Sequence, residues 1–461
     1  MTQLSNNYQP HLILESKIIL KLASPVIATQ ILQMSAVVLD TLMAGRANAV
    51  ELSGVAVGSS LWVPLFLLLI GTLSALTPTI AQLAGSRRWS HMPFQVHQSL
   101  WKLLILLPFA WLTNLGVSPI FEFMKVNENI MPVATGYITA MMWGLPALLA
   151  YNMLRYFSDG LGLTKPAMYA ALLGLIINAP LNYVLIFGEF GFPKLGGVGC
   201  GWASAISFWV MFIFMLAWVL LRVEYKHCRL FQRFYKPSKK HIFSLYKTGF
   251  PIGAAFLVES SVFSLIALFV SRFDATVVAA HQIALNVASL LFMVPLSIGL
   301  TLTIRIGQII GAKEYQRARY VANLGISMAL MYGLITGLLL WAFRLNIPQL
   351  YNDQPEVILL CSELLLFAAL FQIGDAAQVA IAGSLRGYKD TRVPMYLTII
   401  AFWVIAMPLG YSLGIAGVTG KPLMAHGFWI GLIAGLMSVA GLLYVRLMRV
   451  SKKRIKGSSL S

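Results

Sequence analysis

Long apolar runs separated by short polar stretches dominate the chain. The run from 250 to 270 reads FPIGAAFLVESSVFSLIALFV and contains one acid, Glu259, near its middle. The run is long enough to cross a bilayer, which takes about 20 mostly apolar residues in a helix. An ionised side chain at bilayer depth costs several kcal/mol, so it usually faces a bundle interior or a water-filled path. Glu259 is therefore the first candidate functional residue.

The same pattern predicts an all-α polytopic membrane protein with twelve transmembrane helices. Hydrophobic residues make up 58% of the 461 positions and charged residues only 11%, whereas soluble domains carry roughly 25% charged residues. Pro64 and Pro295 lie inside predicted helices and are expected to kink them. The helices are expected at roughly 18–41, 54–83, 98–119, 131–155, 167–188, 199–221, 249–270, 279–311, 320–343, 358–384, 393–415 and 427–447.

The basic residues predict the orientation of the chain. The net charge is +18, and the 34 Lys and Arg residues concentrate in 222–247 and 446–456. Loops after odd-numbered helices carry only Arg46, Lys125, Lys194, Arg272, Arg344 and Lys421. The positive-inside rule then places both termini and the central linker in the cytoplasm. Because the basic runs lie between apolar segments, they predict contact with lipid headgroups and no nucleic-acid partner.

The two halves of the chain resemble each other at an offset of 226 residues. Pro25 then aligns with Pro251, Arg46 with Arg272, and Gln82 with Gln308, and such polar matches rarely arise by chance among apolar helices. The pattern predicts an N-terminal six-helix bundle at 1–221, a basic cytoplasmic linker at 222–248, a C-terminal six-helix bundle at 249–447 and a basic cytoplasmic tail at 448–461.

Because each half has an even number of helices, the repeats are parallel and related by an axis along the membrane normal. Two pseudo-symmetric bundles of this kind are expected to enclose a central cleft and to expose it alternately to each side. The pattern is therefore typical of a secondary transporter.

Three acids lie clearly within predicted helices: Asp40, Glu259 and Asp375. The last two are expected near the bilayer midplane in the same half, and Asp40 higher in the first half. None of them has an acidic counterpart in the other repeat; Glu259 aligns with Gln33, for example. Neighbouring buried carboxylates can share a proton or a hard cation such as Na⁺. The alternative is a structural role in which Ser, Thr or backbone groups satisfy each acid.

Other polar residues allow two interpretations. Asn178 and Asn182 lie one turn apart and flank Pro180, so they could supply carbonyl oxygens beside Asp40 or bridge helices near the proline. His281 could be pH-sensitive or merely interfacial. No intramembrane Lys or Arg is an obvious partner for the acids, and Arg305 is expected to extend toward the cytoplasmic surface.

The sequence gives no indication of an enzyme or of a cofactor. It contains no Walker A sequence, no HExxH and no nucleophile elbow in a suitable context, and its three cysteines lack metal-ligand spacing. We therefore expect transport driven by an ion gradient or by a separate subunit, with no obligate protein partner evident.

Several stretches together resemble the multidrug and toxic compound extrusion (MATE) transporters, in particular the bacterial NorM-like branch. The similarity covers about 15 to 445. The stretches are VLDTLMAGR (38–46), LTPTIAQLAG (76–85), GLGLTKPAM (160–168), INAPLNYVLIFG (177–188), LGGVGCGWA (195–203), LVESSVF (257–263), AAHQIALN (279–286), LYNDQPEV (350–357), FQIGDAAQ (371–378) and LRGYKDTRVP (385–394).

This resemblance implies an inner-membrane antiporter that exports cationic, often aromatic drugs and dyes in exchange for Na⁺ or H⁺, with Na⁺ favoured for the NorM-like branch. By motif match, Glu259 and Asp375 correspond to the cation-binding acids of the second bundle and are the candidate Na⁺ ligands. Asp40 corresponds to the acid of the first bundle, with Asn178 and Asn182 as its polar partners. Gln282 corresponds to a polar position near the second-bundle site.

One position departs from the family pattern. Phe371, one turn before Asp375, can be Tyr in relatives, so a hydroxyl ligand is missing here. The alternative function is a lipid-linked oligosaccharide flippase of the same broad superfamily. Such a protein is expected to line its cleft with Arg or Lys, which are nearly absent at midplane depth.

Overall fold

The computed structural model describes residues 12–123, 126–230, 232–418 and 420–458, and these ranges are helical with no strand. The elements of the first half are α1 (Leu12–Ala47), α2 (Ala49–Leu73), α3 (Leu76–Gly85), η1 (Trp89–His91), α4 (Met92–Leu115), α5 (Val117–Phe123), α6 (Met131–Gly160), α7 (Lys165–Phe187), η2 (Glu189–Gly191), α8 (Gly197–Leu221) and η3 (Val223–Cys228). Those of the second half are α9 (Lys239–Val270), α10 (Ala275–Gly311), α11 (Tyr315–Ala342), α12 (Asn346–Gln349), α13 (Pro355–Gly387), α14 (Arg392–Ile399), the π-helical η4 (Ile400–Ala406), α15 (Met407–Gly414) and α16 (Ala425–Ser458).

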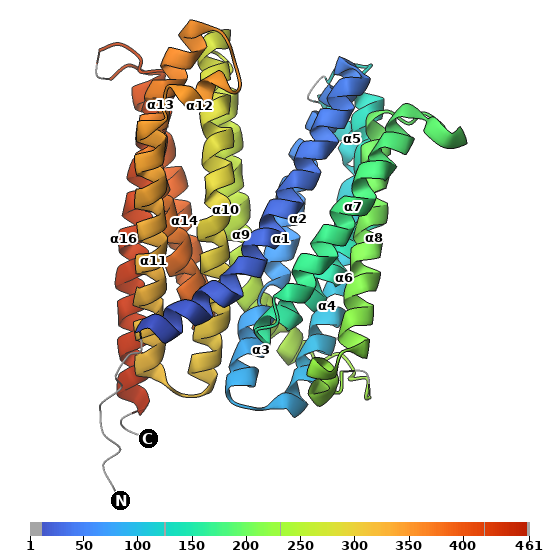
Figure 1. Cartoon of the computed structure of the whole chain (residues 1–461), viewed down its shortest axis with the longest axis vertical. Coiled ribbons are helices and arrows are strands. Elements are labelled where there is room, and N and C mark those ends of the chain that lie inside the picture. The colour runs from blue at the N-terminus through green and yellow to red at the C-terminus, as the bar shows by residue number, and fades with distance from the viewer. Residues whose placement is uncertain (1–11, 124–125, 231, 419, 459–461) are drawn as a thin grey trace, which may run out of the picture. The chain divides into compact units, whose positions relative to one another are not determined.

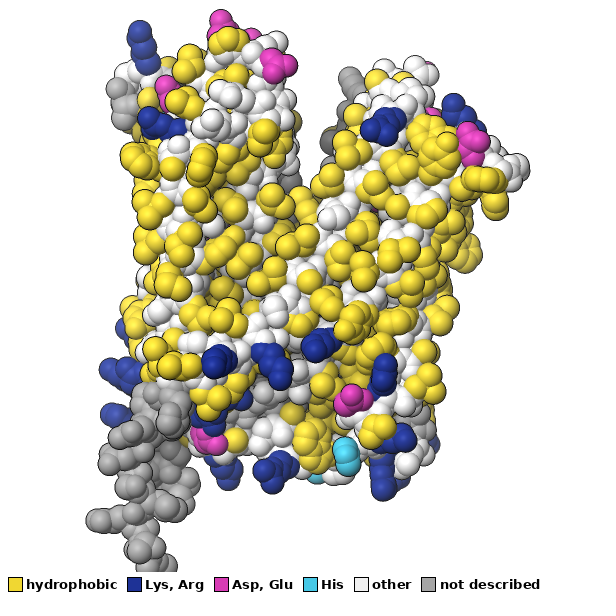
Figure 2. All heavy atoms as spheres, viewed as in Figure 1, with side chains coloured by type: hydrophobic (Ala, Val, Ile, Leu, Met, Phe, Trp, Pro, Cys, Tyr) yellow, Lys and Arg dark blue, Asp and Glu magenta, His cyan; other side chains and the backbone are white. Residues whose placement is uncertain are grey.

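Twelve helical stretches in the described part of the chain are long and apolar enough to cross a membrane, which confirms the predicted number. Figure 2 shows hydrophobic side chains along most of the visible length of each part, with Lys and Arg gathered near the lower end. The chain is therefore a multi-pass membrane protein.

The chain folds into two compact units. The N-terminal unit is Ser24–Phe256, and the C-terminal unit is Leu257–Ser461 together with the start of the chain up to Ala23. The unit boundaries fall inside α1 and α9, so the first turns of each of these helices belong to a different unit from the rest. The predicted boundaries near 221 and 249 instead followed the linker composition.

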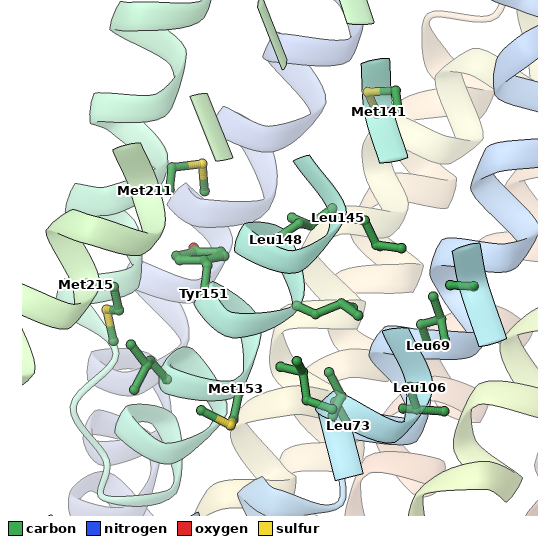
Figure 3. Packing of buried hydrophobic residues seen from close by; sticks show 14 of the residues in the cluster. Leu69, Leu73, Leu106, Met141, Leu145, Leu148, Tyr151, Met153, Met211 and Met215 are labelled. Carbon is green, nitrogen blue, oxygen red and sulfur yellow. The ribbon is translucent and has the colours of Figure 1, made fainter. Parts of the chain in front are cut away.

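In the N-terminal unit α6 is the central helix, and it packs against α2, α4 and α8. Figure 3 shows its side chains Leu145, Leu148 and Tyr151 among hydrophobic residues of the neighbouring helices. Met211 comes from α8 and Leu69 from α2. A larger share of α6 is buried inside the protein than of any other spanning helix in the first half, so α6 is the helix least suited to face lipid in this unit.

The break between α2 and α3 is held by a buried lysine. Thr72 lies just before the break, and its carbonyl oxygen accepts a hydrogen bond from Lys102 Nζ at 2.8 Å. The Lys102 side chain is almost completely inaccessible. A carbonyl at a helix break lacks its usual amide donor, so the ammonium group satisfies it inside the bundle.

In the C-terminal unit α13 packs against α10, α11 and α16, and Figure 1 shows α10, α11 and α13 side by side. Large aromatic side chains fill the space among these helices, with Phe402, Phe428 and Trp429 fully buried. Pro295 lies inside α10, as predicted, and Pro64 lies inside α2 in the other unit.

Candidate cation-binding sites

Asp40 lies near the end of α1 and is 8% exposed. Its Oδ1 accepts a hydrogen bond from Asn182 Nδ2 at 2.5 Å, and its Oδ2 accepts one from Ser204 Oγ at 2.9 Å. Asn182 Nδ2 also donates to Asn178 Oδ1 at 2.9 Å, and Asn178 Nδ2 lies 3.3 Å from Ser204 Oγ. The structure thus brings together the three residues that the sequence suggested, and it adds Ser204.

Local structure explains how α7 and α8 present these groups to α1. Asn178 and Asn182 are one helical turn apart on α7, so their side chains share a face. On α8, Cys200 and Ser204 are likewise one turn apart, and Cys200 Sγ donates to the main-chain oxygen of Asp40 at 3.6 Å. Gly199 lies so close to the backbone of Leu185 on α7 that a Cβ would come within 2.8 Å of it.

The start of α8 is fixed by a second carboxylate. Gly197 N donates to Glu51 Oε2 at 2.5 Å, and Asn48 caps the helix that carries Glu51. A carboxylate at a helix N-terminus satisfies free amide groups and complements the helix dipole. Glu51 therefore fixes the start of α8, the helix that carries Ser204, against α2.

The Asp40 site contains one buried oxygen that is not engaged. Asn182 Oδ1 has no hydrogen-bond partner among the described residues. This oxygen belongs to the Asn182 amide, whose nitrogen donates to Asp40. A small cation bound at the Asp40 carboxylate would therefore have the amide oxygen of Asn182 as a further candidate ligand. Because one carboxylate supplies a single negative charge, the site suits a proton or a monovalent ion.

The second site is built by α9 and α13 in the C-terminal unit. Asp375 is 3% exposed and Glu259 is partly buried. The two side chains are close enough for the charge of Glu259 to act on Asp375, and Arg386 on the same helix as Asp375 acts electrostatically on Glu259. The structure thus places the two predicted acids in one neighbourhood.

This pair differs from Asp40 in its surroundings. Within the described residues, neither Glu259 nor Asp375 accepts a hydrogen bond from another side chain or forms a salt bridge, whereas Asp40 accepts two. A buried carboxylate without hydrogen-bond donors is costly to ionise. The lack of donors at both carboxyl groups is the feature that most favours a bound proton or cation.

Gln378 adds a further oxygen near Asp375. It lies three residues later on α13, so it shares a face with Asp375. The side chain is 4% exposed, and its Oε1 has no partner among the described residues. Carboxylate and amide oxygens suit hard cations. Sequence reasoning missed this residue, although its position in FQIGDAAQ offered the signal.

Aromatic rings form the wall beside the second site. Phe371 contacts Phe263 edge-on with ring centroids 6.2 Å apart, and it contacts Trp429 at 5.7 Å. Trp429 in turn lies 6.1 Å from the ring of His281. Residue 371 has no hydroxyl group, so the side chain presents only an aromatic ring where a tyrosine would also present an oxygen ligand.

Within the described structure, the remaining predicted residues make no hydrogen bond to the candidate acids. His281 is 1% exposed, so it is a buried residue and not an interfacial one. Gln282 is exposed on α10 and makes no side-chain hydrogen bond in the described part of the chain. Arg305 does not merely extend to the membrane surface as expected, because it forms a salt bridge with Glu15.

Comparison with known proteins adds independent information. A family model described as MatE matches the chain twice, over residues 25–184 and 251–412. The two matches begin at Pro25 and Pro251, so their separation (251 − 25 = 226) equals the internal offset in the sequence.

Relatives and solved structures agree with this match. The chain is 41% identical over 435 residues to "Multidrug resistance protein NorM" of Photobacterium profundum, covering 94% of this chain and 95% of that protein. It is also 41% identical over 447 residues to "Multidrug resistance protein PmpM" of Pseudomonas aeruginosa, covering 96% and 93%. The fold matches a structure described as the outward-facing conformation of a multidrug resistance MATE family transporter, with TM-score 0.87, 19% identity, and coverage of 96% and 97%.

Proposed function

The chain belongs to the MatE family, and from that premise we propose that it is a multidrug efflux antiporter of the bacterial inner membrane, with both termini in the cytoplasm. It exports cationic and aromatic drugs and dyes in exchange for a monovalent cation, Na⁺ in preference to H⁺. The names of its relatives, which refer to multidrug resistance, support small-molecule drugs as the substrates. It is a transporter and not an enzyme.

One observation carries the proposal. The charge of Glu259 acts on Asp375 inside one membrane-spanning unit, and neither carboxyl group has a hydrogen-bond donor among the described side chains. Like charges at short range in a poorly hydrated site repel each other strongly. Binding of a cation or a proton removes this repulsion. The pair therefore attracts the coupling ion, and the ion gradient determines from which side of the membrane the ion binds.

Coupling follows from competition between two positively charged ligands. A cationic drug and the coupling ion both reduce the repulsion between the acids, but they need not favour the same conformation. A ligand shifts a two-state equilibrium only by its differential affinity for the two states. If Na⁺ binding favours release of the drug on the outside, then by linkage drug binding favours release of Na⁺ on the inside.

The oxygen donors support Na⁺ as the coupling ion. The carboxylate oxygens of Glu259 and Asp375 and the Oε1 of Gln378 are hard ligands, which suit a hard cation such as Na⁺. The Asp40 site in the other unit is proposed as a linked site that binds a proton or Na⁺. Its hydrogen bonds from Asn182 and Ser204 hold the carboxylate ready for a ligand.

The decisive experiment uses purified protein in liposomes loaded with ethidium. An imposed Na⁺ gradient, with the pH gradient collapsed, is expected to drive ethidium efflux. Efflux driven only by a pH gradient would replace Na⁺ with H⁺ as the coupling ion. No ion-dependent efflux under either gradient would overturn the antiporter assignment.

Variants connect the flux to the site. Glu259→Gln and Asp375→Asn are expected to abolish ion-driven efflux while the protein remains in the membrane. Glu363→Gln is the matched control, because Glu363 lies on α13 but is an exposed residue paired with His426. Wild-type efflux in both site variants would contradict the role assigned to the pair.

The flippase alternative is disfavoured by the state of the buried basic residues. Lys102 donates to the Thr72 carbonyl, and Arg155 lies 3.5 Å from Asp159 and donates to Gln30. Both are engaged by the protein in the described structure. A pyrophosphate-linked lipid would need basic groups that are available to it.

A further inference from the structure

The buried carboxylate of Glu15 stands at the start of α1, far from both candidate cation sites in the sequence. It is 1% exposed and forms salt bridges with Arg305 of α10 and Arg317 of α11. Arg305 donates to both carboxylate oxygens, at 2.9 and 3.0 Å, and Arg317 donates to Oε1 through Nε at 2.7 Å and Nη2 at 2.5 Å. All of these groups belong to the C-terminal unit.

The start of α1 buries only one narrow face of the helix. Glu15, Ile19 and Ala23 on this face are buried and spaced one turn apart. Ile19 joins the apolar cluster that contains Ile298 and Leu302 of α10. The flanking residues Leu12, Ile13, Leu14 and Leu20 are all more than half exposed. The ion pairs are therefore the main specific contact of this segment.

α1 is also divided between the two units. Its residues up to Ala23 belong to the C-terminal unit, and from Ser24 onward it belongs to the N-terminal unit, where it carries Asp40. The equivalent position in the other repeat is α9, whose residues up to Phe256 belong to the N-terminal unit. At the offset of 226, Glu15 aligns with His241.

The two equivalent segments are held by different chemistry. His241 stacks edge-on against Phe94 at 4.7 Å and lies 2.9 Å from Ser238 Oγ. Gly249 and Gly253 of α9 approach the backbone of α2 so closely that a Cβ at either position would overlap a carbonyl oxygen. Close backbone packing of this kind is rigid. The start of α9 is therefore held by close backbone packing, and none of the salt bridges among the described residues involves it.

An ion-pair cluster is suited to reversible release. The desolvation cost of a buried ion pair offsets much of its Coulomb gain, so the pair fixes the geometry of the contact while adding little net stability. Arg317 also holds a second partner, Glu314, through Nη1 at 2.7 Å. When Glu15 leaves, Arg317 keeps a counter-ion and its charge is not stranded.

We propose that the Glu15–Arg305–Arg317 cluster is a releasable latch, which holds the first turns of α1 on α10 and α11 in one state of the transport cycle and opens in the other. The inference rests on the proposed transport function. Release frees α1 from Leu12 to Ala23 while the start of α9 stays in place, so the two repeats contribute unequally to the conformational change.

A reversible cross-link tests the latch. Glu15→Cys and Arg317→Cys are combined in a background in which Cys228 and Cys361 are Ala and Cys200 is Ser, which keeps a donor for the Asp40 main-chain oxygen. Efflux by this variant before cross-linking is the reference. These two side chains are long, so a bis-methanethiosulfonate reagent with a short spacer is used in place of a direct disulfide. Cross-linking is expected to lower ethidium efflux by about tenfold or more, because a transporter confined to one state cannot complete its cycle. A reductant is expected to restore efflux.

The matched control is the equivalent contact of the other repeat. Phe94→Cys with His241→Cys, cross-linked in the same way, is expected to leave efflux unchanged. Normal efflux with the 15–317 cross-link in place would overturn the latch. Loss of efflux with both cross-links would overturn the assignment of release to α1 alone.

A second readout does not depend on drug transport. Ile19→Cys places a thiol on the buried face of this segment, and its labelling by N-ethylmaleimide in membranes reports release of the segment. Adding Glu15→Gln is expected to raise the labelling rate several-fold, while Glu363→Gln leaves it unchanged. Absence of labelling in a protein that transports ethidium would overturn the latch. If no ion gradient drives efflux in the uncross-linked protein, the proposed function fails, and the labelling result still decides the latch.

Discussion

Asn182 donates to the Asp40 carboxylate at 2.5 Å across 142 positions of sequence, and this bond joins α7 to α1 inside the N-terminal unit. With Ser204 from α8 it gives the carboxylate two donors. The second site pairs the buried Asp375 with the partly buried Glu259, and neither acid has such a donor among the described side chains. The two candidate sites therefore differ in whether hydrogen bonds stabilise the carboxylate, and this difference has measurable effects on stability.

Removing the hydroxyl donor at Asp40 is expected to destabilise the protein. Ser204→Ala leaves one buried carboxylate oxygen without its partner, which costs about 1–3 kcal/mol for a bond to a charged group. The measurement is thermal unfolding of purified protein, compared with Ser207→Ala. Ser207 lies on α8 and is equally buried, but its hydroxyl donates to the main chain of its own helix, at Ala203 O. Equal stability of the two variants would show that Ser204 does not support Asp40.

Neutralising the second site is expected to have the opposite effect on stability. Asp375→Asn removes a charge that has no donor to lose, so stability without Na⁺ is expected to equal or exceed that of the wild type. Added Na⁺ at about 100 times its Kd stabilises a one-site protein by about 2.7 kcal/mol. We expect wild type to show Na⁺-dependent stabilisation and Asp375→Asn to lose it.

Choline chloride at the same concentration is the control for ionic strength in this measurement. Stabilisation of the Asp375→Asn variant by Na⁺ to the same extent as wild type would place the ion elsewhere. A fall in the stability of this variant without Na⁺ would mean that Asp375 has a structural partner after all.

The number and type of the helices follow from the sequence because the bilayer imposes a length and a composition on every span. The internal repeat was also predictable from the sequence, and the two matches to one family model begin at the aligned residues Pro25 and Pro251. Asp40, Glu259 and Asp375 were found because an acid in an apolar run is rare. In these respects local chemistry alone was sufficient.

Partners that are distant in sequence were not predictable in the same way. Glu15 precedes the first predicted helix, which begins at 18, and its partner Arg305 lies 290 positions away. Ser204 sits in a run of small residues, where a hydroxyl is indistinguishable from a packing residue until the helices are placed. Lys102 lies only a few residues inside its predicted span, and nothing local indicated that it donates to Thr72.

Restoring a hydroxyl beside Asp375 is expected to strengthen ion binding. Phe371→Tyr adds an oxygen one turn before Asp375, and a single additional ligand or hydrogen bond is worth about 1 kcal/mol. The apparent affinity for Na⁺ in ethidium efflux is therefore expected to rise several-fold. Phe371→Leu is the control, because it removes the ring contacts with Phe263 and Trp429 without adding oxygen. An unchanged Na⁺ affinity in Phe371→Tyr would show that position 371 does not face the bound ion.

The close approach of α9 to α2 gives the last prediction. A Cβ at Gly249 would overlap the carbonyl oxygen of Thr72, the same oxygen that accepts from Lys102. Neither backbone can move without separating the start of α9 from the bundle, so Gly249→Ala is expected to destabilise the protein by about 1–3 kcal/mol or more. Gly441→Ala is the control, because a Cβ at that exposed position of α16 meets no atom within 4 Å. This substitution is expected to be neutral or slightly stabilising, since alanine favours a helix over glycine by about 1 kcal/mol. Thermal unfolding of both variants measures the difference, and a Gly249→Ala protein as stable as wild type would mean that the start of α9 is not rigidly packed.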